Sequence, residues 1–264
     1  MGLCPPEPWG LDDGGSFVPG AHQRWLWEAW KKVWDEAQQI RERESAVLHW
    51  FNLGDGIDGH HHDSPQVVTS REMGQSKIFE RCAEVPLSLR PDHIVAIRGT
   101  EAHAGRSGQY DDAVFDKIAD LGHPVTRDPA TGAATWWHYR REIGGLLIDA
   151  THHGKMSKMP QGRGPYMRAY AERIWNEHAR NGERPPDICL RGHNHKKGDS
   201  GPPLDIPTRA LALPCFQLAT TFGHKVAPDS TADIGGVIIT IRNREAEVRF
   251  VTSKVDRNPT LEPL

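Results

Sequence analysis

Cysteines are few in this sequence, and long apolar runs are absent. The four cysteines among its 264 residues show no C-x-x-C spacing, which excludes a cysteine-rich zinc module and a disulfide framework. No run of about eighteen apolar residues is present, so we expect no membrane-spanning helix. No basic segment followed by an apolar segment opens the sequence, and we therefore expect a cytoplasmic protein.

Charge of one sign is also scarce. The sequence has 32 Lys and Arg against 35 Asp and Glu, a formal net charge of −3, so it lacks the overall basic character of many nucleic-acid-binding proteins. Its hydrophobic fraction of 37% and charged fraction of 25% are typical of a folded globular protein. We expect residues 1–264 to form a single domain, since this length supports one large hydrophobic core.

Histidine is abundant by contrast, with 15 residues, several of them in loops that follow apolar runs. Four such loops hold residue types that bind divalent metals or transfer protons. They are residues 54–59 after the run 46–51, residues 98–103 after 93–97, residues 149–154 at the end of 143–150, and residues 190–195 after 188–190. Because open α/β sheets bind ligands at the carboxyl ends of their strands, these loops predict one shared site.

The apolar periodicity predicts helices mixed with strands, followed by strands alone. The expected helices cover residues 21–43, 70–85, 110–121 and 166–180, and Pro86 is expected to end the second of them. The expected strands are the four apolar runs above and residues 135–141, 211–222, 234–242 and 245–252. Residues 1–20 are expected to form an extended loop, and residues 155–164 a flexible basic loop. This order favours a layered α/β domain.

The residue types in the four loops suit the hydrolysis of a phosphate ester. Two divalent ions about 3.5–4 Å apart would neutralise charge and activate a water molecule. Asp55 could bridge such ions, while His193 and His195 could point to two neighbouring ions. One of His152 and His153 could complete the ligands of the second ion.

Two further residues are candidates for moving the proton. His103 is the candidate general acid, because a charged imidazole can protonate a leaving alkoxide. Asp58 could orient His103 and hold it in its charged form. The neighbouring run of residues 60–62 could add a metal or phosphate contact, although a solvated histidine-rich loop is the simpler interpretation.

The motifs G-D-x-x-D, a glycine-led loop ending in His, H-H-G and G-H-x-H, in this order, resemble the calcineurin-like metallophosphoesterase superfamily from about residue 46 to 225. The resemblance implies a four-layer α/β/β/α sandwich with two packed mixed sheets. It also implies two divalent metal ions, with Mn favoured over Fe and Zn. Asp55 would bridge the ions, with His193, His195 and one of His152 and His153 as further ligands.

The sequence departs from the family pattern at two places. The third motif of the family is usually G-N-H-(D/E), whereas Gly99 is followed here by Thr100, Glu101, Ala102 and His103, so that Thr100 or Glu101 would have to replace the Asn ligand. The family also opens with a strand ending in D-x-H, and no such motif precedes Asp55. We therefore expect the first metal site to be incomplete and the first strand of the domain to be missing.

Basic residues near the loops are candidates for binding the substrate. Arg191 could clamp a phosphate, or could instead pair with a nearby carboxylate. Lys155 could hold a phosphodiester backbone, or belong to an ordinary basic loop. The expected function is a metal-dependent phosphoesterase, either a phosphodiesterase or a nuclease, acting on a phosphoester substrate with nucleic acid among the candidates. The alternative is a catalytically impaired relative that binds a phosphate ligand or a protein partner.

Overall fold

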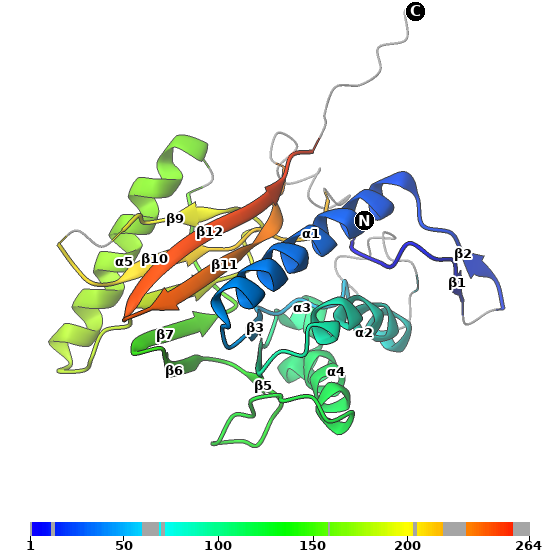
Figure 1. The fold of residues 1–264 in the computed structure, drawn as a ribbon, viewed down its shortest axis with the longest axis horizontal. Helices are drawn as coiled ribbons and strands as arrows, with labels where there is room; N and C mark the ends of the chain where they lie inside the picture. The colour runs from blue at the N-terminus through cyan, green and yellow to red at the C-terminus, as the bar shows by residue number, and fades with distance from the viewer. Residues whose placement is uncertain are drawn as a thin grey trace, which may run out of the picture.

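The computed structural model describes residues 2–11, 14–59, 69, 72–157, 159–202, 205–218 and 231–255, and its elements are shown in Figure 1. Some features expected from the sequence lie outside these ranges. They are His60, His61, His62, Lys158 of the basic loop, and the last residues of the strand expected at 211–222.

A five-stranded mixed sheet forms one inner layer of the molecule. Its strands, in spatial order, are β6 (Tyr139–Ile143), β7 (Leu146–Thr151), β8 (Ile188–Arg191), β10 (Arg209–Ala212) and β9 (Gly198–Asp199). The central strands β7, β8 and β10 run parallel, and the two edge strands are antiparallel to their neighbours. Helix α5 (Arg163–Arg180) covers the outer face, where Met167 and Ala171 are buried against β8 and β10.

The second inner layer consists of two groups of strands. Strands β3 (His49–Asn52), β4 (His93–Ile97) and β5 (Thr135–Trp136) are parallel, and β11 (Ile234–Arg242) and β12 (Glu245–Ser253) form an antiparallel hairpin. Helices α1 (Ala21–Glu44), α2 (Glu72–Ser88) and α4 (Gln109–Asp120) pack on the outer side of this layer. Helix α1 forms because Leu26, Ala29, Val33 and Ala37 recur at helical spacing and are all buried.

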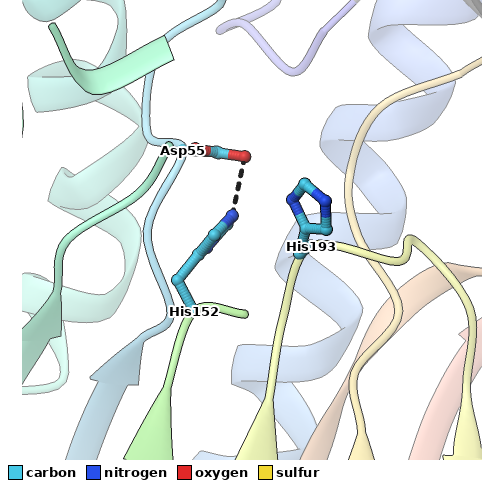
Figure 2. Close-up of side chains that lie close together, drawn as sticks. All are labelled: Asp55, His152 and His193. Atoms are coloured by element: carbon cyan, nitrogen blue, oxygen red, sulfur yellow. Dashed lines mark ion pairs between the residues drawn. The ribbon is translucent and has the colours of Figure 1, made fainter. Parts of the chain in front are cut away.

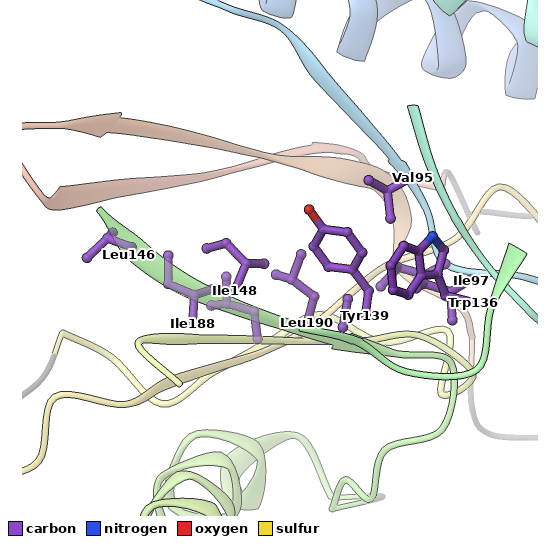
Figure 3. Packing of buried hydrophobic residues seen from close by; sticks show 11 residues of the cluster. Val95, Ile97, Trp136, Tyr139, Leu146, Ile148, Ile188 and Leu190 are labelled. Atoms are coloured by element: carbon purple, nitrogen blue, oxygen red, sulfur yellow. The ribbon is translucent and has the colours of Figure 1, made fainter. Parts of the chain in front are cut away.

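The main hydrophobic core lies between the two inner layers. It is built from Val95 and Ile97 of β4, Ile148 of β7 and Leu190 of β8, with Tyr139 of β6 among them (Figure 3). Apolar side chains of β11 and β12 pack against the same core. Helices therefore cover two facing layers of strands, which confirms the predicted α/β sandwich.

Most predicted elements match in position. The strand expected at 211–222 is the short β10, which ends at Ala212, and three further differences have physical reasons. The strand expected at 135–141 is divided into β5 and β6, which belong to different layers, and Trp137 is exposed where the chain crosses between them. Helix α2 continues past Pro86 to Ser88, because the Pro86 carbonyl still accepts a hydrogen bond from Leu89 N at 3.2 Å. The first twenty residues contain a short hairpin of β1 (Trp9–Gly10) and β2 (Ser16–Phe17) instead of a simple loop.

Short helical segments complete the described fold. They are α3 (Glu101–Ala104), η1 (Arg106–Gly108) and η2 (Pro160–Gly162), the last of which lies within the expected basic loop. Within the described ranges, every helix is too short or too polar to pass through a bilayer.

Candidate metal centre

The four predicted loops meet where the strands of the two inner layers end. Asp55 follows β3, Gly99 and Thr100 follow β4, His152 follows β7 and His193 follows β8. Both strand pairs, β3 with β4 and β7 with β8, are parallel, so their carboxyl ends lie at the same side of the sandwich. Figure 2 shows Asp55, His152 and His193 converging from three of these loops. Their donor atoms all lie within 4.8 Å of one another.

The closest pair of donor atoms joins the two inner layers. Asp55 Oδ2 lies 3.0 Å from His152 Nε2, and the side chain of His152 is only 4% exposed (Figure 2). The Nδ1–H of His152 donates to the carbonyl oxygen of Leu53, which assigns a proton to Nδ1. His152 Nε2 is buried, and Asp55 is the partner that the structure gives it among the described residues. Unless a cation lies between the two atoms, this short contact requires a proton on Nε2, so that His152 and Asp55 form a buried ion pair.

This arrangement fits a bound cation. Two ligand atoms at about 2.1 Å from one ion and at right angles to it are separated by roughly 3.0 Å, which agrees with the Asp55–His152 distance. A histidine whose second nitrogen is held by a backbone carbonyl is also the usual arrangement at a metal. Asp55, His152 and His193 provide one carboxylate and two imidazoles, a set that suits Mn, Fe or Zn.

Asp55 is held in place by the loop after β4. Its Oδ1 accepts hydrogen bonds from the backbone N–H of Thr100 at 2.7 Å and from the Thr100 hydroxyl at 3.1 Å. Burial opposes ionisation of Asp55, but the adjacent His152 ring, His103 and the Thr100 N–H outweigh it and lower the pKa of Asp55 to about 2. A Cβ at Gly99 would lie 2.2 Å from Asp55 Oδ1, so this close approach requires glycine.

Ionisation of His152 depends on the same carboxylate. Burial alone would lower the pKa of His152, but the Asp55 carboxylate and the Leu53 carbonyl together raise it. Without a cation, a proton on His152 would compensate the charge of Asp55. A metal ion between the two atoms would take over that role.

The remaining predicted histidine ligands lie around this triad. His153 is exposed and lies outside the triad, whereas His152 is buried with Nε2 3.0 Å from Asp55, so the geometry favours His152 over His153 as the ligand. His195 lines the same cavity as the triad but lies outside it. Burial lowers the pKa of His195 to about 4, which keeps its imidazole neutral and able to bind a metal near pH 7.

His103 also lines this cavity, and its orientation differs from the expectation. His103 Nδ1 lies 2.7 Å from the backbone carbonyl of Asp58, so the main chain of Asp58, not its carboxylate, orients this nitrogen. The Asp58 carboxylate accepts a hydrogen bond from Gln217, and burial raises its pKa. The Asp58 carboxylate also interacts electrostatically with His103, which opposes this rise, so its role in holding His103 charged stays a prediction beside the observed role of its backbone.

The structure does not bring Glu101 to the triad. Thr100 caps α3, and Glu101 begins that helix with an exposed side chain. Of the two predicted replacements for the missing Asn, Thr100 contacts Asp55 directly, whereas Glu101 faces solvent. Lys155 is exposed too, one residue beyond Gly154, whose carbonyl accepts a hydrogen bond from Asn194 at 2.6 Å.

Arg191 has a structural role, which corrects its prediction as a phosphate clamp. It is 6% exposed, and its guanidinium donates to Asp149 Oδ1 at 2.6 Å, to the Asp149 carbonyl at 3.1 Å and to the Tyr170 hydroxyl at 2.9 Å. Asp149 lies on β7 and Arg191 on the neighbouring strand β8. Tyr170 belongs to α5, so its contact with Arg191 places both charges between the outer helix and the sheet. The second interpretation of Arg191, a pair with a carboxylate, is the one that the structure bears out.

We expect Arg191→Met to lower the free energy of unfolding by about 3 kcal/mol, because the buried Asp149 would lose its charged partner. Urea denaturation at pH 7 measures this loss. Arg184→Met is the matched control, since Arg184 pairs with Glu142 and Asp187 at the surface and should cost far less. Equal losses in the two variants would contradict the structural role of Arg191.

Asp111 is a supporting residue that sequence reasoning missed. It is 2% exposed in the first turn of α4, and its carboxylate accepts a hydrogen bond from Gly99 N at 2.8 Å. It thereby holds the loop that in turn holds Asp55. The two acidic residues 111–112 at the start of a predicted helix were the visible signal of such a role. Acidic residues are common at helix starts, however, because they interact favourably with the helix dipole, so the signal was not specific.

Burial raises the pKa of Asp111 from 3.8 to about 6, so its protonated form is favoured by folding. The stability from this group is complete below about pH 4 and lost as the pH rises through 6, a change of about 3 kcal/mol. We expect Asp111→Asn to remove this pH dependence. Urea denaturation of both metal-free proteins from pH 4 to pH 8 measures it, and a difference that stays constant with pH would contradict the assignment.

Comparisons with known proteins add likenesses of fold alone. No family model and no curated protein matches this chain. Among solved structures, the chain is similar to an archaeal phosphodiesterase, at 12% identity and a TM-score of 0.38 over 84% of this chain and 92% of that one. It is also similar to Vps29 from Entamoeba histolytica in complex with zinc, at 13% identity and a TM-score of 0.35 over 78% and 98%. A hypothetical protein from Pyrococcus horikoshii shares 11% identity and a TM-score of 0.43 over 87% and 84%.

Proposed function

We propose that this protein is a metal-dependent hydrolase of phosphate esters, acting as a phosphodiesterase. The observation that carries the proposal is the convergence of three donor atoms: buried His152 Nε2 lies 3.0 Å from Asp55 Oδ2 with its Nδ1 held by a carbonyl, and a nitrogen of His193 lies within 4.8 Å of both. A buried pair of this kind costs folding free energy unless a cation or a proton lies between the atoms. His193 supplies a third donor at the solvent-exposed side, where a substrate could approach.

A divalent ion bound by this triad would polarise a phosphoryl oxygen and lower the pKa of a bound water molecule. Asp55 keeps its charge at every working pH, and Thr100 occupies Oδ1 while Oδ2 faces His152. His103 would carry the proton for the leaving oxygen on Nε2, because its Nδ1–H is directed to the carbonyl of Asp58.

In the complete site that we propose, two divalent ions would be bound, with Mn favoured. Asp55, His152 and His193 would hold one ion, and His195 is the candidate ligand for a second one bridged by Asp55. Within the described residues, the triad is the one group of three such side chains whose donor atoms meet. Elemental analysis after loading with manganese distinguishes one bound ion from two.

The hydrolase proposal is tested with bis(p-nitrophenyl) phosphate as substrate. We expect turnover with Mn²⁺, none with excess EDTA, and recovery when Mn²⁺ is restored. His152→Ala should lose both metal and turnover. His178→Ala should keep both, because His178, near the end of α5, pairs with Glu183 and lies outside the donor triad. Tight manganese binding without turnover of any phosphodiester would reject the enzyme and leave a binding protein.

That binding protein is the second candidate function. The observation in its favour is the single donor triad, which would hold an ion and a phosphate group without the full two-metal arrangement. The basic loop gives little support for nucleic acid as a ligand, because its Arg163 is already paired with Asp233 at 3.0 Å. Binding of inorganic phosphate only in the presence of Mn²⁺, measured by calorimetry, is the expected signature of this alternative.

A further inference from the structure

The cavity of about 870 Å³ that the candidate metal centre lines extends into the layer formed by β3–β4–β5 and β11–β12. Helix α1 forms one wall through Val33, Trp34, Ala37 and Ile40, and Ile148 and Leu190 of the five-stranded sheet lie on the opposite side. Its lining is mainly apolar. Well-packed protein interiors rarely contain a void of this size, so the presence of this cavity calls for an explanation.

The remaining two walls are strand edges. Residues 46–58 and 235–242 line the cavity without interruption. Side chains alternate between the two faces of a strand, so a wall made of consecutive residues is the edge of the strand and not its face. Among the described strands, β3 pairs with β4 alone and β11 with β12 alone. Both therefore turn a hydrogen-bonding edge toward the same cavity.

The directions of the two edges are compatible with one strand between them. β3 runs toward Asp55, whereas β11 begins beside the histidine loop, where Asp233 N donates to the His195 carbonyl at 2.9 Å. The two strands therefore run in opposite directions across the cavity. One residue of a strand occupies roughly 160 Å³, from the usual rise, strand spacing and layer thickness, so the cavity holds about five residues.

Polar atoms in the lining show that the occupant is not a simple hydrocarbon. Trp34 is 8% exposed, and its indole N–H has no hydrogen-bond partner among the described residues. Nδ1 of His49, at the start of β3, is likewise without a partner there. Both residues line the cavity. An extended peptide would offer carbonyl and N–H groups to the two edges and to these atoms, whereas an acyl chain would leave them all unsatisfied.

We propose that this cavity receives an extended peptide segment of a partner protein, which pairs with β3 and β11 and joins the two groups of strands into one sheet. The segment would have about five apolar, β-branched residues, because helices cover one face of the layer and the five-stranded sheet covers the other. The affinity would come from main-chain hydrogen bonds along both edges. This proposal does not depend on the proposed hydrolase activity.

The test is hydrogen–deuterium exchange of the full chain with the synthetic peptide acetyl-KKVIVIVT-amide. We expect the amides of His49–Asn52 that face away from β4, and those of Ile234–Arg242 that face away from β12, to exchange at least tenfold more slowly in its presence. The control peptide acetyl-KKVPVPVT-amide lacks the central N–H groups and should protect neither strand. Ala37→Leu narrows the cavity and should weaken protection by the first peptide.

Unchanged exchange in either strand at saturating peptide would overturn the proposal, whether or not Ala37→Leu folds. Laurate serves as the competing probe. A rise in melting temperature with laurate, and none with the peptide, would assign the cavity to an acyl chain instead. Peptide protection in a protein that binds no manganese would leave this inference standing and reject the proposed function. Metal-dependent turnover without peptide protection would support the proposed function and reject this inference.

Discussion

Replacing Asp55 with Asn is expected to weaken manganese binding by more than about a hundredfold, because even a residue that only supports a ligand contributes 10–100-fold. Asn retains an acceptor for the Thr100 N–H and tolerates the positive φ of 55° at this position, so the loop should keep its path. Only the negative charge opposite His152 is lost. Isothermal titration of metal-free protein with Mn²⁺ measures the effect.

Asp58→Asn is the matched control for this experiment, because Asp58 lies in the same loop but its carboxylate accepts from Gln217 and lies outside the triad. Its manganese affinity should stay within a few-fold of the original. The depressed pKa of Asp55 makes a second readout available, since its ionised form stabilises the metal-free fold above about pH 4 and this contribution is lost as the pH falls through 2. At pH 7 the Asn variant should lose about 2 kcal/mol. Unchanged metal affinity in Asp55→Asn would remove Asp55 from the site.

His103→Ala is expected to lower kcat for an alkyl phosphodiester by roughly 10²–10⁴-fold while leaving manganese content unchanged. The reason is that His103 lines the cavity outside the donor triad, with Nδ1 fixed by the Asp58 carbonyl at 2.7 Å. An alkoxide needs a proton as it leaves, whereas p-nitrophenolate leaves without one. The loss should therefore be much smaller with bis(p-nitrophenyl) phosphate.

The comparison of the two substrates separates proton donation from a structural effect. A variant that is merely misfolded would lose both activities equally, and circular dichroism with thermal melting would show it. His123→Ala provides a control for removing an imidazole, because His123 lies in the turn after α4. A fall in bound manganese in His103→Ala would instead make His103 a ligand and contradict its assignment as an acid.

Local sequence patterns predicted the strand ends that meet at the site. β4 and β11 occupy the predicted residues, α1 ends one residue later than predicted, and α4 begins and ends one residue earlier. Apolar periodicity is a local property, and the burial of each face follows from it. The carboxyl ends of parallel strands lie together, so placing the loops after strands was sufficient to predict that the loops of Asp55, of His152 and His153, and of His193 and His195 would share one site.

The sequence by itself thus determined the α/β class, the order of the elements and the loops that carry the candidate metal ligands. The tertiary structure alone decided the choice of His152 over His153, the contact of His103 with the Asp58 backbone, and the pairing of Arg191 with Asp149. It also revealed Asp111 beneath the site and the cavity between β3 and β11. The physical reason is that the direction and burial of a side chain at a strand end depend on partners 12 to 99 positions away, which no local pattern encodes.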